Sequence, residues 1–394
     1  MIKDISELTE EVYQQVIDIR RHLHRNPELS FQERKTSQYI CEQLEEWNIP
    51  FQNNIGGYGI SGSIGESTHG GKTIALRADM DALPIQEKNN VPYASEVAGV
   101  MHACGHDVHT ASLLGTSYVL QQMKEKLNGH VRLIFQPGEE RLPGGASYMI
   151  RDGILKNPTP AAILGQHVHP PLKVGQVGFR SGKYMASVDE IFITLSGPGG
   201  HGAMPHLSVD LNLLASHIVI QLQQVISRRS NPIVPSVITI GKMVSEGGAT
   251  NVLPAKVHLE GTFRTMDETW RKEAHQIMKD MVWHMAQLMG AQAEIEIKTG
   301  YPYLFNDPEL TERVREEAIR FLGKDKVKEL PVRMTSEDFS YYSHEIKACF
   351  YRIGIQSSVM GRRELHTPTF DVDEQCFRTS VGLMAYLALC FLND

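Results

Sequence analysis

Apolar residues at the start of the chain recur at the spacing of an amphipathic helix. They are three or four positions apart, at Ile5, Leu8, Val12, Val16, Ile19 and Leu23. This spacing places them on one helical face. The helix should end near Asn26-Pro27, because the residue before a proline is disfavoured in the helical region. A second helix is predicted at 32–47.

Short, mainly apolar runs follow and have the pattern of buried strands. They lie at 73–76, 131–135 and 161–164, and a helical pattern lies at 110–123. Each run is followed by carboxyl or imidazole side chains. Because the carboxyl ends of parallel strands meet at one edge of an open α/β sheet, we expect these side chains to form a site there.

The pattern changes from about residue 186, where a strand alternates apolar and polar residues. The expected elements are a strand at 188–195, a helix at 210–227, strands at 237–240 and 255–265, a helix at 268–289 and a strand at 292–298. The order βαββαβ is typical of a ferredoxin-like unit. A chain of 394 residues also exceeds the size at which one core keeps growing. We therefore expect an α/β domain with a central mixed sheet flanked by helices, formed by 1–185 and 298–394 and interrupted by a domain at 186–297.

The composition is that of an ordinary globular protein, with 41% hydrophobic and 22% charged residues. A net charge of −7 without a basic stripe argues against nucleic-acid binding. No apolar run reaches the ~18 residues of a membrane span, so no membrane segment is expected. The five cysteines lack paired spacing, and no hydrophobic targeting segment precedes Ile5. We therefore expect a cytoplasmic protein with free thiols.

Two glycine-rich stretches resemble nucleotide-binding motifs but lack the required context. Residues 57–62 satisfy G-x-G-x-x-G, yet no helical pattern follows them, whereas a dinucleotide site needs a strand, a turn and a helix. Residues 65–73 resemble a phosphate loop, but one residue too many separates the glycines and a strand follows. We interpret 65–73 as a hairpin connection.

Between Val100 and His109, three imidazoles, a thiol and a carboxylate lie within eight residues. Cys104 and the imidazole two residues later, separated by Gly105 where the backbone turns freely, suit one divalent ion or a bridged pair. The start of the helix at 110–123 should favour a thiolate at Cys104. The alternative is a histidine-rich helix start with a buried cysteine. Further candidate ligands favour a metal site, and these are Glu139, Glu140, His167, His169 and His366.

Eight motifs span nearly the whole chain. They lie at 21–29, 77–84, 100–109, 136–140, 199–203, 250–254, 261–264 and 366–368. In this order they resemble the amidohydrolase branch of the co-catalytic zinc-peptidase superfamily, which includes hippurate hydrolases, indole-acetyl-amino-acid hydrolases and N-acetyldiaminopimelate deacetylases. The resemblance implies a catalytic domain at 1–185 and 298–394, with a lid and dimerisation domain at 186–297.

The resemblance also implies two divalent ions per subunit. Their expected ligands are Cys104, His106, Glu140, His167 and His366. The Cys104 thiolate is expected to bridge the ions, where most of the superfamily has an aspartate. Asp79 occupies the place of a ligand histidine of the wider superfamily, and His106 is expected to supply that nitrogen. Asp81 should accept a hydrogen bond from a ligand imidazole and thereby set its tautomer.

Glu139 is the expected general base, because it binds no ion in this scheme and its pKa can be set for proton transfer. His167 and His169 both lie beyond a strand end, and only the resemblance favours His167. From the inserted domain, His201 is expected to donate a hydrogen bond to the oxyanion in the site of a partner subunit. Asn251 and Arg264 are expected to bind the substrate carboxylate, which a guanidinium matches with two hydrogen bonds.

The sequence therefore predicts a metal-dependent amidohydrolase that cleaves N-acyl amino acids, of N-acetyl or hippurate type, to a carboxylic acid and a free amino acid. The expected metals are zinc, manganese, nickel or cobalt. The alternative is a dipeptidase or carboxypeptidase with the same dimetal centre. A silent binding protein is disfavoured, because Glu139 and every expected ligand are present. The expected partners are the substrate and a second copy of the chain, with neither nucleic acid nor membrane.

Overall fold

The computed structural model describes residues 1–66, 71–247, 249–357 and 363–393 and divides the chain into two compact units. The first unit comprises Met1–Tyr184, Phe305–Val332 and Glu337–Asp394. The second comprises Met185–Leu304 and Arg333–Ser336. The second unit thus extends beyond the expected residue 297 and includes a short segment from later in the chain.

An eight-stranded mixed sheet forms the centre of the first unit, in the order β1-β2-β4-β3-β5-β16-β6-β15. Its strands are β1 Phe51–Ile55, β2 Gly59–Gly65, β3 Lys72–Asp79, β4 Gly129–Gln136, β5 Ala162–Lys173, β6 Val177–Phe179, β15 Val327–Glu329 and β16 Ala348–Gln356. The strands β4, β3, β5 and β16 are parallel neighbours. The three mainly apolar runs lie in β3, β4 and β5, which are largely buried as their pattern predicts.

The glycine-rich stretch at 65–73 is not a hairpin connection, because β4 lies between β2 and β3 in the sheet. Residues 67–70 of this stretch lie outside the described part of the chain. The stretch at 57–62 falls in a turn and in β2, and the next described element is β3 rather than a helix. The order of elements required for a dinucleotide site is therefore not met.

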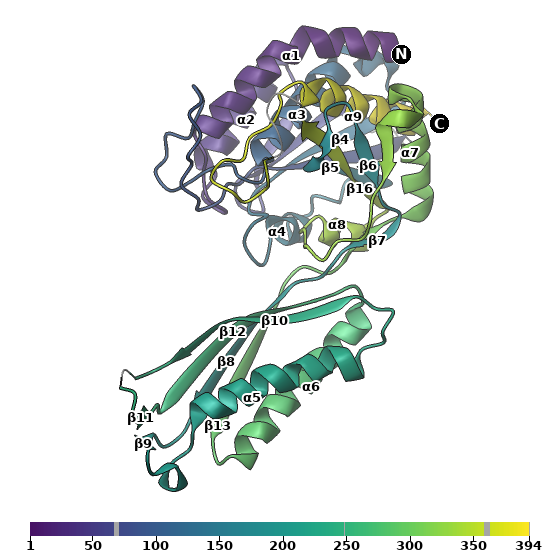
Figure 1. Ribbon diagram of the computed structural model, residues 1–394. Helices are drawn as coiled ribbons and strands as arrows, with labels where there is room; N and C mark the ends of the chain where they lie inside the picture. The colour runs from purple at the N-terminus through teal and green to yellow at the C-terminus, as the bar shows by residue number, and fades with distance from the viewer. Residues whose placement is uncertain (67–70, 248, 358–362, 394) are drawn as a thin grey trace. The chain divides into compact units, whose positions relative to one another are not determined.

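Helices cover both faces of this sheet (Figure 1). They are α1 Ile2–Arg25, α2 Arg34–Glu46, α3 His106–Gln122, α4 Gly145–Arg151, α7 Pro308–Leu322, α8 Ser340–Glu345 and α9 Cys376–Asn393. The helices α3 and α9 pack on the sheet, and α1 packs on both of them. The short helices α4 and α8 lie together on the opposite face (Figure 1). The predicted apolar stripe of α1 is buried except for Leu8, which is half-buried, and the helix ends at Arg25, two residues before the proline.

Helix α9 is long enough and, by its mean hydropathy, apolar enough to cross a membrane, although it is not an uninterrupted apolar run. Arg378 interrupts the apolar pattern, but the mean hydropathy of the helix remains high enough for a membrane span. In the structure 78% of this helix is buried, and it packs against α1 and α3. It is therefore a core helix of the first unit.

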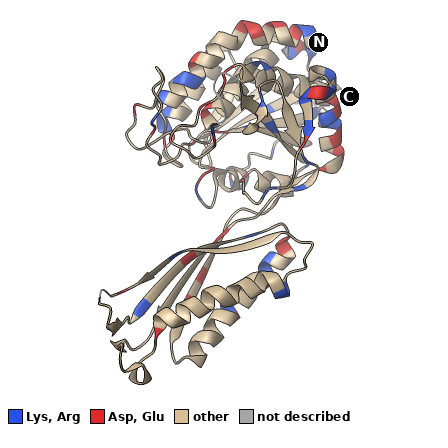
Figure 2. Ribbon diagram, in the orientation of Figure 1, with Lys and Arg blue, Asp and Glu red and all other residues tan. Residues whose placement is uncertain are grey.

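Basic and acidic side chains are interspersed on the outer helices (Figure 2). Several form ion pairs, such as Arg378 with Glu10 at 2.7 Å and Lys126 with Asp4 at 2.6 Å. Exposed pairs of this kind add little stability. The mixture of signs agrees with the lack of a basic stripe in the sequence.

The second unit is a four-stranded antiparallel sheet with two helices on one face (Figure 1). Its elements have the predicted βαββαβ order and are β8 Asp189–Ser196, α5 Leu211–Gln224, β10 Ser236–Ser245, β12 Lys256–Thr265, α6 Glu268–Leu288 and β13 Gln292–Thr299. The strand order is β10-β12-β8-β13, which leaves β10 and β13 at the edges. The alternating strand β8 buries every second residue against the helices.

Candidate active site

Three parallel strands bring polar side chains to one edge of the first unit's sheet. Strand β3 ends at Asp79, just before Asp81, and β4 ends at Gln136, shortly before Glu139. Strand β5 carries His167. Because β4, β3 and β5 are parallel neighbours, the side chains that follow β3 and β4 meet His167, which lies within β5.

Several overlapping groups of donor atoms lie at this edge, and two of them share Cys104. The Sγ atom of Cys104 and ring nitrogens of His106 and His167 lie within 4.8 Å of one another. The same distance limit joins Cys104 to a carboxylate oxygen of Glu140 and a ring nitrogen of His366. Cys104 belongs to both groups, so one sulfur can contact two cations. Sulfur, nitrogen and oxygen donors together suit transition-metal ions.

Hydrogen bonds at the Nδ1 atoms orient the two buried imidazoles. Nδ1 of His106 donates to the backbone carbonyl of Asp81 at 2.9 Å and lies 3.2 Å from Oδ1 of the same residue. Nδ1 of His167 donates to the carbonyl of Val168 at 2.7 Å. The Nε2 atom of His106 has no hydrogen-bond partner among the described residues, and that of His167 lies 3.5 Å from the sulfur of Cys104. Both Nε2 lone pairs are thus available to a metal ion.

His109 lies in the same cluster, but both of its ring nitrogens are engaged. Its Nδ1 donates to Oδ1 of Asp79 at 2.6 Å, and its Nε2 accepts the backbone N–H of Val168 at 2.9 Å. Asp79 also accepts a hydrogen bond from Nη1 of Arg77 at 2.5 Å. Asp79 therefore anchors His109 and Arg77.

Cys104 lies in a tight turn before α3. Gly105 has a φ of 87°, and a Cβ atom there would lie 2.6 Å from a methyl group of Val168. Burial, followed by the charge of Glu140, raises the pKa of the Cys104 thiol. Without a cation, desolvation therefore outweighs the effect of the helix end, which the sequence predicts to favour a thiolate. A bound cation would reverse this, since a coordinating thiol loses its proton.

Glu140 and His366 complete the cluster. Oε1 of Glu140 lies 3.9 Å from Nε2 of His106 and 3.4 Å from Nε2 of His366. The backbone N–H of His366 donates to the carbonyl of Ala103 at 2.8 Å. Oε1 of Glu140 is buried without a hydrogen-bond partner among the described residues, as is Nε2 of His106. Buried lone pairs are costly unless they are satisfied, so this donor set fits bound divalent ions.

Glu139 is buried beside these donors, with Oε2 at 4.0 Å from Nε2 of His106. The backbone N–H of Asp338 donates to its Oε1 at 3.4 Å. Burial, followed by the charges of Glu337 and Glu140, raises the pKa of Glu139 well above its usual range. A carboxyl group in such surroundings is suited to taking up and releasing a proton.

The structure adds an acidic pair that sequence reasoning missed. Carboxylate oxygens of Glu337 and Asp338 lie within 4.8 Å of Glu139. Nη2 of Arg77 lies 3.1 Å from Glu337 and donates to Asp338 at 2.7 Å. Gln136 also donates to Asp338, at 2.7 Å. The only sequence signal was that two acidic residues are adjacent shortly before α8, and Asp338 lies 199 positions from Glu139 in the chain.

Comparisons with known proteins agree with this geometry. The model of the family described as "Peptidase family M20/M25/M40" matches residues 75–389. An N-acyl-L-amino acid amidohydrolase of Geobacillus stearothermophilus is 41% identical over 309 residues, or 77% of this chain and 81% of that protein. An N-acetyl-L-cysteine deacetylase of Bacillus subtilis is 40% identical over 362 residues, or 91% of this chain and 84% of that protein. The chain belongs to peptidase family M20/M25/M40.

A solved M20 structure extends the comparison to the fold. It is a dinuclear metal-binding peptidase of Bacillus subtilis, with a TM-score of 0.83 and 34% identity over 98% of this chain and 99% of that one. The fold is thus shared with a metal-binding member of the family. The expectation that His167 and His169 lie beyond a strand end is wrong, because β5 continues through both of them to Lys173. His167 belongs to a donor group with Cys104 and His106, whereas His169 belongs to none of the donor groups among the described residues.

The remaining predicted site residues of this M20 protein lie in the second unit. His201 belongs to a short ribbon in which β9 Gly200–His201 pairs with β11 Val252–Leu253. Nδ1 of His201 accepts a backbone N–H from two residues later at 3.0 Å, so the neutral ring carries its proton on Nε2. The carbonyl of Asn251 accepts the N–H of Gly202 at 2.7 Å, which places Asn251 beside His201.

Arg264 lies on β12 and is half-buried. Its Nη1 donates to the carbonyl of Met334 at 3.2 Å and to Oγ of Ser336 at 3.3 Å. Burial lowers the pKa of Arg264 from its usual range, yet a guanidinium stays charged at neutral pH. The arginine thus ties the segment Arg333–Ser336 to the second unit, a role that the sequence did not predict.

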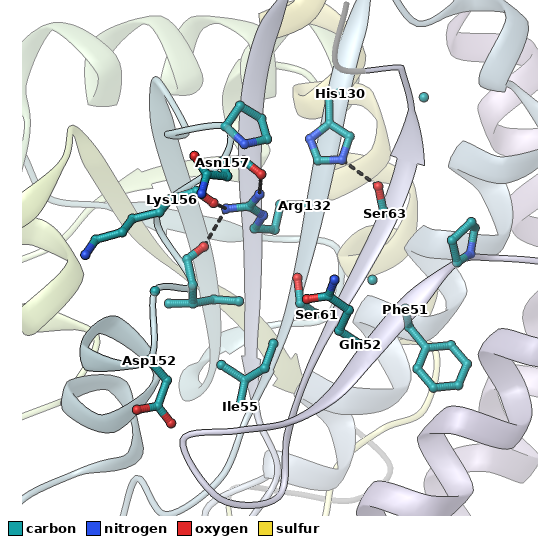
Figure 3. Close-up of a pocket in the computed structure, with 16 residues that line it drawn as sticks. Phe51, Gln52, Ile55, Ser61, Ser63, His130, Arg132, Asp152, Lys156 and Asn157 are labelled. Carbon is teal, nitrogen blue, oxygen red and sulfur yellow. Dashed lines mark hydrogen bonds between the residues drawn. The ribbon is translucent and has the colours of Figure 1, made fainter.

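A groove of about 640 Å³ lies at the amino end of β4, opposite the end that carries the donors (Figure 3). His130 and Arg132 line it. The guanidinium donates to three backbone carbonyls, those of Ile154, Lys156 and Asn157. Its hydrogen bonds thus go to the backbone, and the groove is separate from the cluster of candidate metal ligands.

Proposed function

We propose that this protein hydrolyses the amide bond of N-acyl amino acids and releases a carboxylic acid and a free amino acid. The observation that carries the proposal is the convergence of a buried glutamate, Glu139, with two donor groups that share Cys104. Relatives that are 41% and 40% identical are named as an N-acyl-L-amino acid amidohydrolase and an N-acetyl-L-cysteine deacetylase. These names support N-acyl amino acids as the substrate class.

We assign two divalent ions to five ligands, which are Cys104, His106, Glu140, His167 and His366. Cys104 is the proposed bridge, because it belongs to both donor groups. When bound, the ions polarise the acyl carbonyl and activate water near neutral pH. The mixture of sulfur, nitrogen and carboxylate ligands suits zinc, manganese, nickel or cobalt. Asp81 sets the tautomer of His106 by accepting its Nδ1–H.

Glu139 is the proposed general base. It accepts a proton from the attacking water and returns that proton to the leaving nitrogen. Its raised pKa, caused first by burial, favours a carboxyl group that can hold the proton between these two transfers. The N–H of Asp338 keeps Oε1 in place, which leaves Oε2 on the side of His106.

His201, Asn251 and Arg264 are proposed to act on the substrate from the second unit. The Nε2–H of neutral His201 is a hydrogen-bond donor of the kind that stabilises an oxyanion. Asn251 and Arg264 offer an amide and a guanidinium for the substrate carboxylate. We propose that His201 serves the site of a partner subunit, so that the second unit acts as lid and dimerisation domain.

Exposed apolar residues support a dimer through the second unit. The edge strand β10 exposes Val237, Met243 and Val244, and α5 exposes Leu213 and Ile220. An edge strand with apolar side chains is a template for pairing with another strand. A second copy that pairs along β10 would cover these residues. No disulfide joins any of the five cysteines, which suits the cytoplasm as the proposed location.

Matched substrates test the function. The protein, loaded in turn with Zn²⁺, Mn²⁺, Ni²⁺ or Co²⁺, should hydrolyse hippurate or N-acetyl amino acids with a kcat/KM at least about tenfold above that for dipeptides of the same C-terminal residue, a difference of about 1.4 kcal/mol in activation free energy. Chelator-treated protein is the control. If dipeptides are the better substrates, the peptidase alternative is correct.

A further inference from the structure

The link between α1 and α2 has buried polar side chains next to the loop that carries Glu139, although it contributes no proposed metal ligand. Helix α1 ends at Arg25, and helix α2 begins at Arg34. Within the link, Ser30 is 7% exposed and Glu33 is 0% exposed. Loops normally run over the surface, so burial of two polar side chains here needs partners. Those partners lie in the loops that follow β3 and β4.

Glu33 holds the turn that presents Glu139. Its Oε1 accepts the backbone N–H of Gly138 at 2.7 Å. Gly138 has a φ of 62°, and a Cβ atom there would lie 2.4 Å from the ring of Phe31. The glycine is therefore confined between the carboxyl group of Glu33 and the ring of Phe31. The two residues that follow it are Glu139 and Glu140, the proposed base and a proposed ligand.

Ser30 holds a second point of the same site. Its hydroxyl donates to Oδ2 of Asp81 at 2.6 Å. The same Oδ2 accepts the backbone N–H of Glu140 at 2.9 Å, while Oδ1 lies 3.2 Å from Nδ1 of His106. Asp81 is thus fixed by Ser30 and in turn orients the backbone of one proposed ligand and the ring of another.

Backbone contacts anchor the link itself. Leu29 forms a parallel bridge with Ala82, and the N–H of Ala82 donates to the carbonyl of Glu28 at 2.8 Å. The side chain of Glu28 accepts the N–H of Thr36 at 2.8 Å, which joins the link to the first turn of α2. The link is therefore attached both to a helix and to the loop that carries Asp81.

We propose that residues 28–33 form a brace that positions the metal ligands and the general base, with Glu33 holding the Gly138 turn and Ser30 holding Asp81. The brace rests on the proposed function in the roles given to Glu139, Glu140 and His106. Burial, followed by the charge of Asp81, raises the pKa of Glu33 to about 8, so this carboxyl group is largely uncharged at neutral pH. Glutamine, which is uncharged and keeps an acceptor oxygen, is therefore its conservative replacement.

The test compares Glu33→Leu with Glu33→Gln. Glu33→Leu leaves the Gly138 N–H without an acceptor and releases the turn. We expect its affinity for Zn²⁺, measured by chelator competition, to fall about 10- to 100-fold, as on loss of other residues that support metal ligands. Its kcat should fall by a similar factor, while KM changes less than about threefold. Glu33→Gln should stay within about threefold of the parent in all three quantities.

Ser30→Ala tests the contact between Ser30 and Asp81, and this test does not depend on whether Glu33→Leu folds. It removes one hydroxyl and should lower Zn²⁺ affinity about tenfold. Gln32→Ala is the matched control, because Gln32 lies on the same link but is exposed, and it should retain the parent's affinity and kcat. Thermal unfolding of each variant, followed by circular dichroism, separates positioning from a general loss of stability.

The brace is overturned if folded Ser30→Ala and Glu33→Leu bind Zn²⁺ as tightly as the parent. It is also overturned if Glu33→Gln is as impaired as Glu33→Leu, because the acceptor oxygen is then not what matters. Zn²⁺ affinity is measurable in a protein that hydrolyses no N-acyl amino acid. An inactive parent with weakened Ser30→Ala binding would therefore refute the proposed function and leave the brace standing.

Discussion

The imidazole of His167 meets the thiol of Cys104 at 3.5 Å, although 63 positions separate the two residues in the chain. His167 is oriented for this contact, because its Nδ1 donates to the carbonyl of Val168 and leaves Nε2 directed at the sulfur. Cys104 also lies near Glu140 and His366. A single sulfur therefore joins both donor groups, and its replacement should affect both ions.

Cys104→Ser should lower metal content as well as rate, because a hydroxyl stays protonated where a coordinating thiol ionises. Metal analysis after dialysis, together with the rate at saturating metal, measures both effects. Cys41→Ser is the control, since Cys41 belongs to neither donor group with Cys104. A Cys104→Ser protein with the parent's metal content would make Cys104 structural and require a new assignment of the centre.

Glu139→Gln should separate catalysis from metal binding. The substitution keeps size and leaves every proposed ligand in place, so metal content should persist while kcat falls by a factor of about 10² to 10⁴. Glu140→Gln is the matched comparison, because it changes a proposed ligand next in sequence and should lose metal too. Near-normal turnover in Glu139→Gln would remove this residue from the role of base.

The fold was largely predictable because its elements are long and periodic. The stripe of α1 and the apolar strands β3, β4 and β5 are visible in the sequence, and so is the βαββαβ order of the second unit. The ribbon of β9 and β11 was not predictable, since two residues per strand show no period. The return of Arg333–Ser336 to the second unit depends on contacts with Arg264, which have no local signal.

The candidate site could be predicted where the proposed ligands and base lie in local sequence motifs. It could not be predicted where residues distant in the sequence change the surroundings of these side chains. Cys104, His106 and Glu139 stand in dense polar motifs, but Glu337 and Asp338 reach Glu139 only through folding. The pKa of Cys104 shows the same limit. Its position before a helix predicts a thiolate, whereas its burial, known only from the fold, has the opposite and larger effect.

Stability should depend on pH through His130, which lies far along β4 from the metal ligands. Burial, followed by the charge of Arg132, lowers the pKa of His130 to about 4, compared with about 6.5 when unfolded. As the pH falls, His130 therefore binds a proton in the unfolded chain at a higher pH than in the folded protein. Neutral His130 therefore adds to the free energy of unfolding. This addition is fully present above pH 6.5 and is lost as the pH falls towards 4, and it amounts to at most about 3 kcal/mol.

His130→Gln should remove this dependence. Urea unfolding of parent and variant at several pH values between 4 and 7 measures it, and the stability of the variant should decline less as the pH falls. His206→Gln changes an exposed histidine of the second unit and should leave the decline as it is in the parent. Equal declines in the parent and His130→Gln would show that His130 does not titrate in this way.

The proposed role of His201 in a partner subunit's site can be tested by mixing two inactive variants. His201→Ala and Glu139→Gln chains should each be nearly inactive alone. In a two-fold symmetric dimer each site takes Glu139 from one chain and His201 from the other. A mixed dimer therefore has one site in which both residues are changed and one site in which both are intact.

Co-refolding equal amounts of the two variants should then restore activity. Random association makes about half of the dimers mixed, and each of these has one intact site of two, so up to about a quarter of the parent's specific activity is expected. Mixed dimers are identified by tagging one variant and isolating them in two steps. If such dimers form and remain at background activity, His201 either serves its own subunit or takes no part in catalysis, because no arrangement across the two-fold axis would leave an intact site silent.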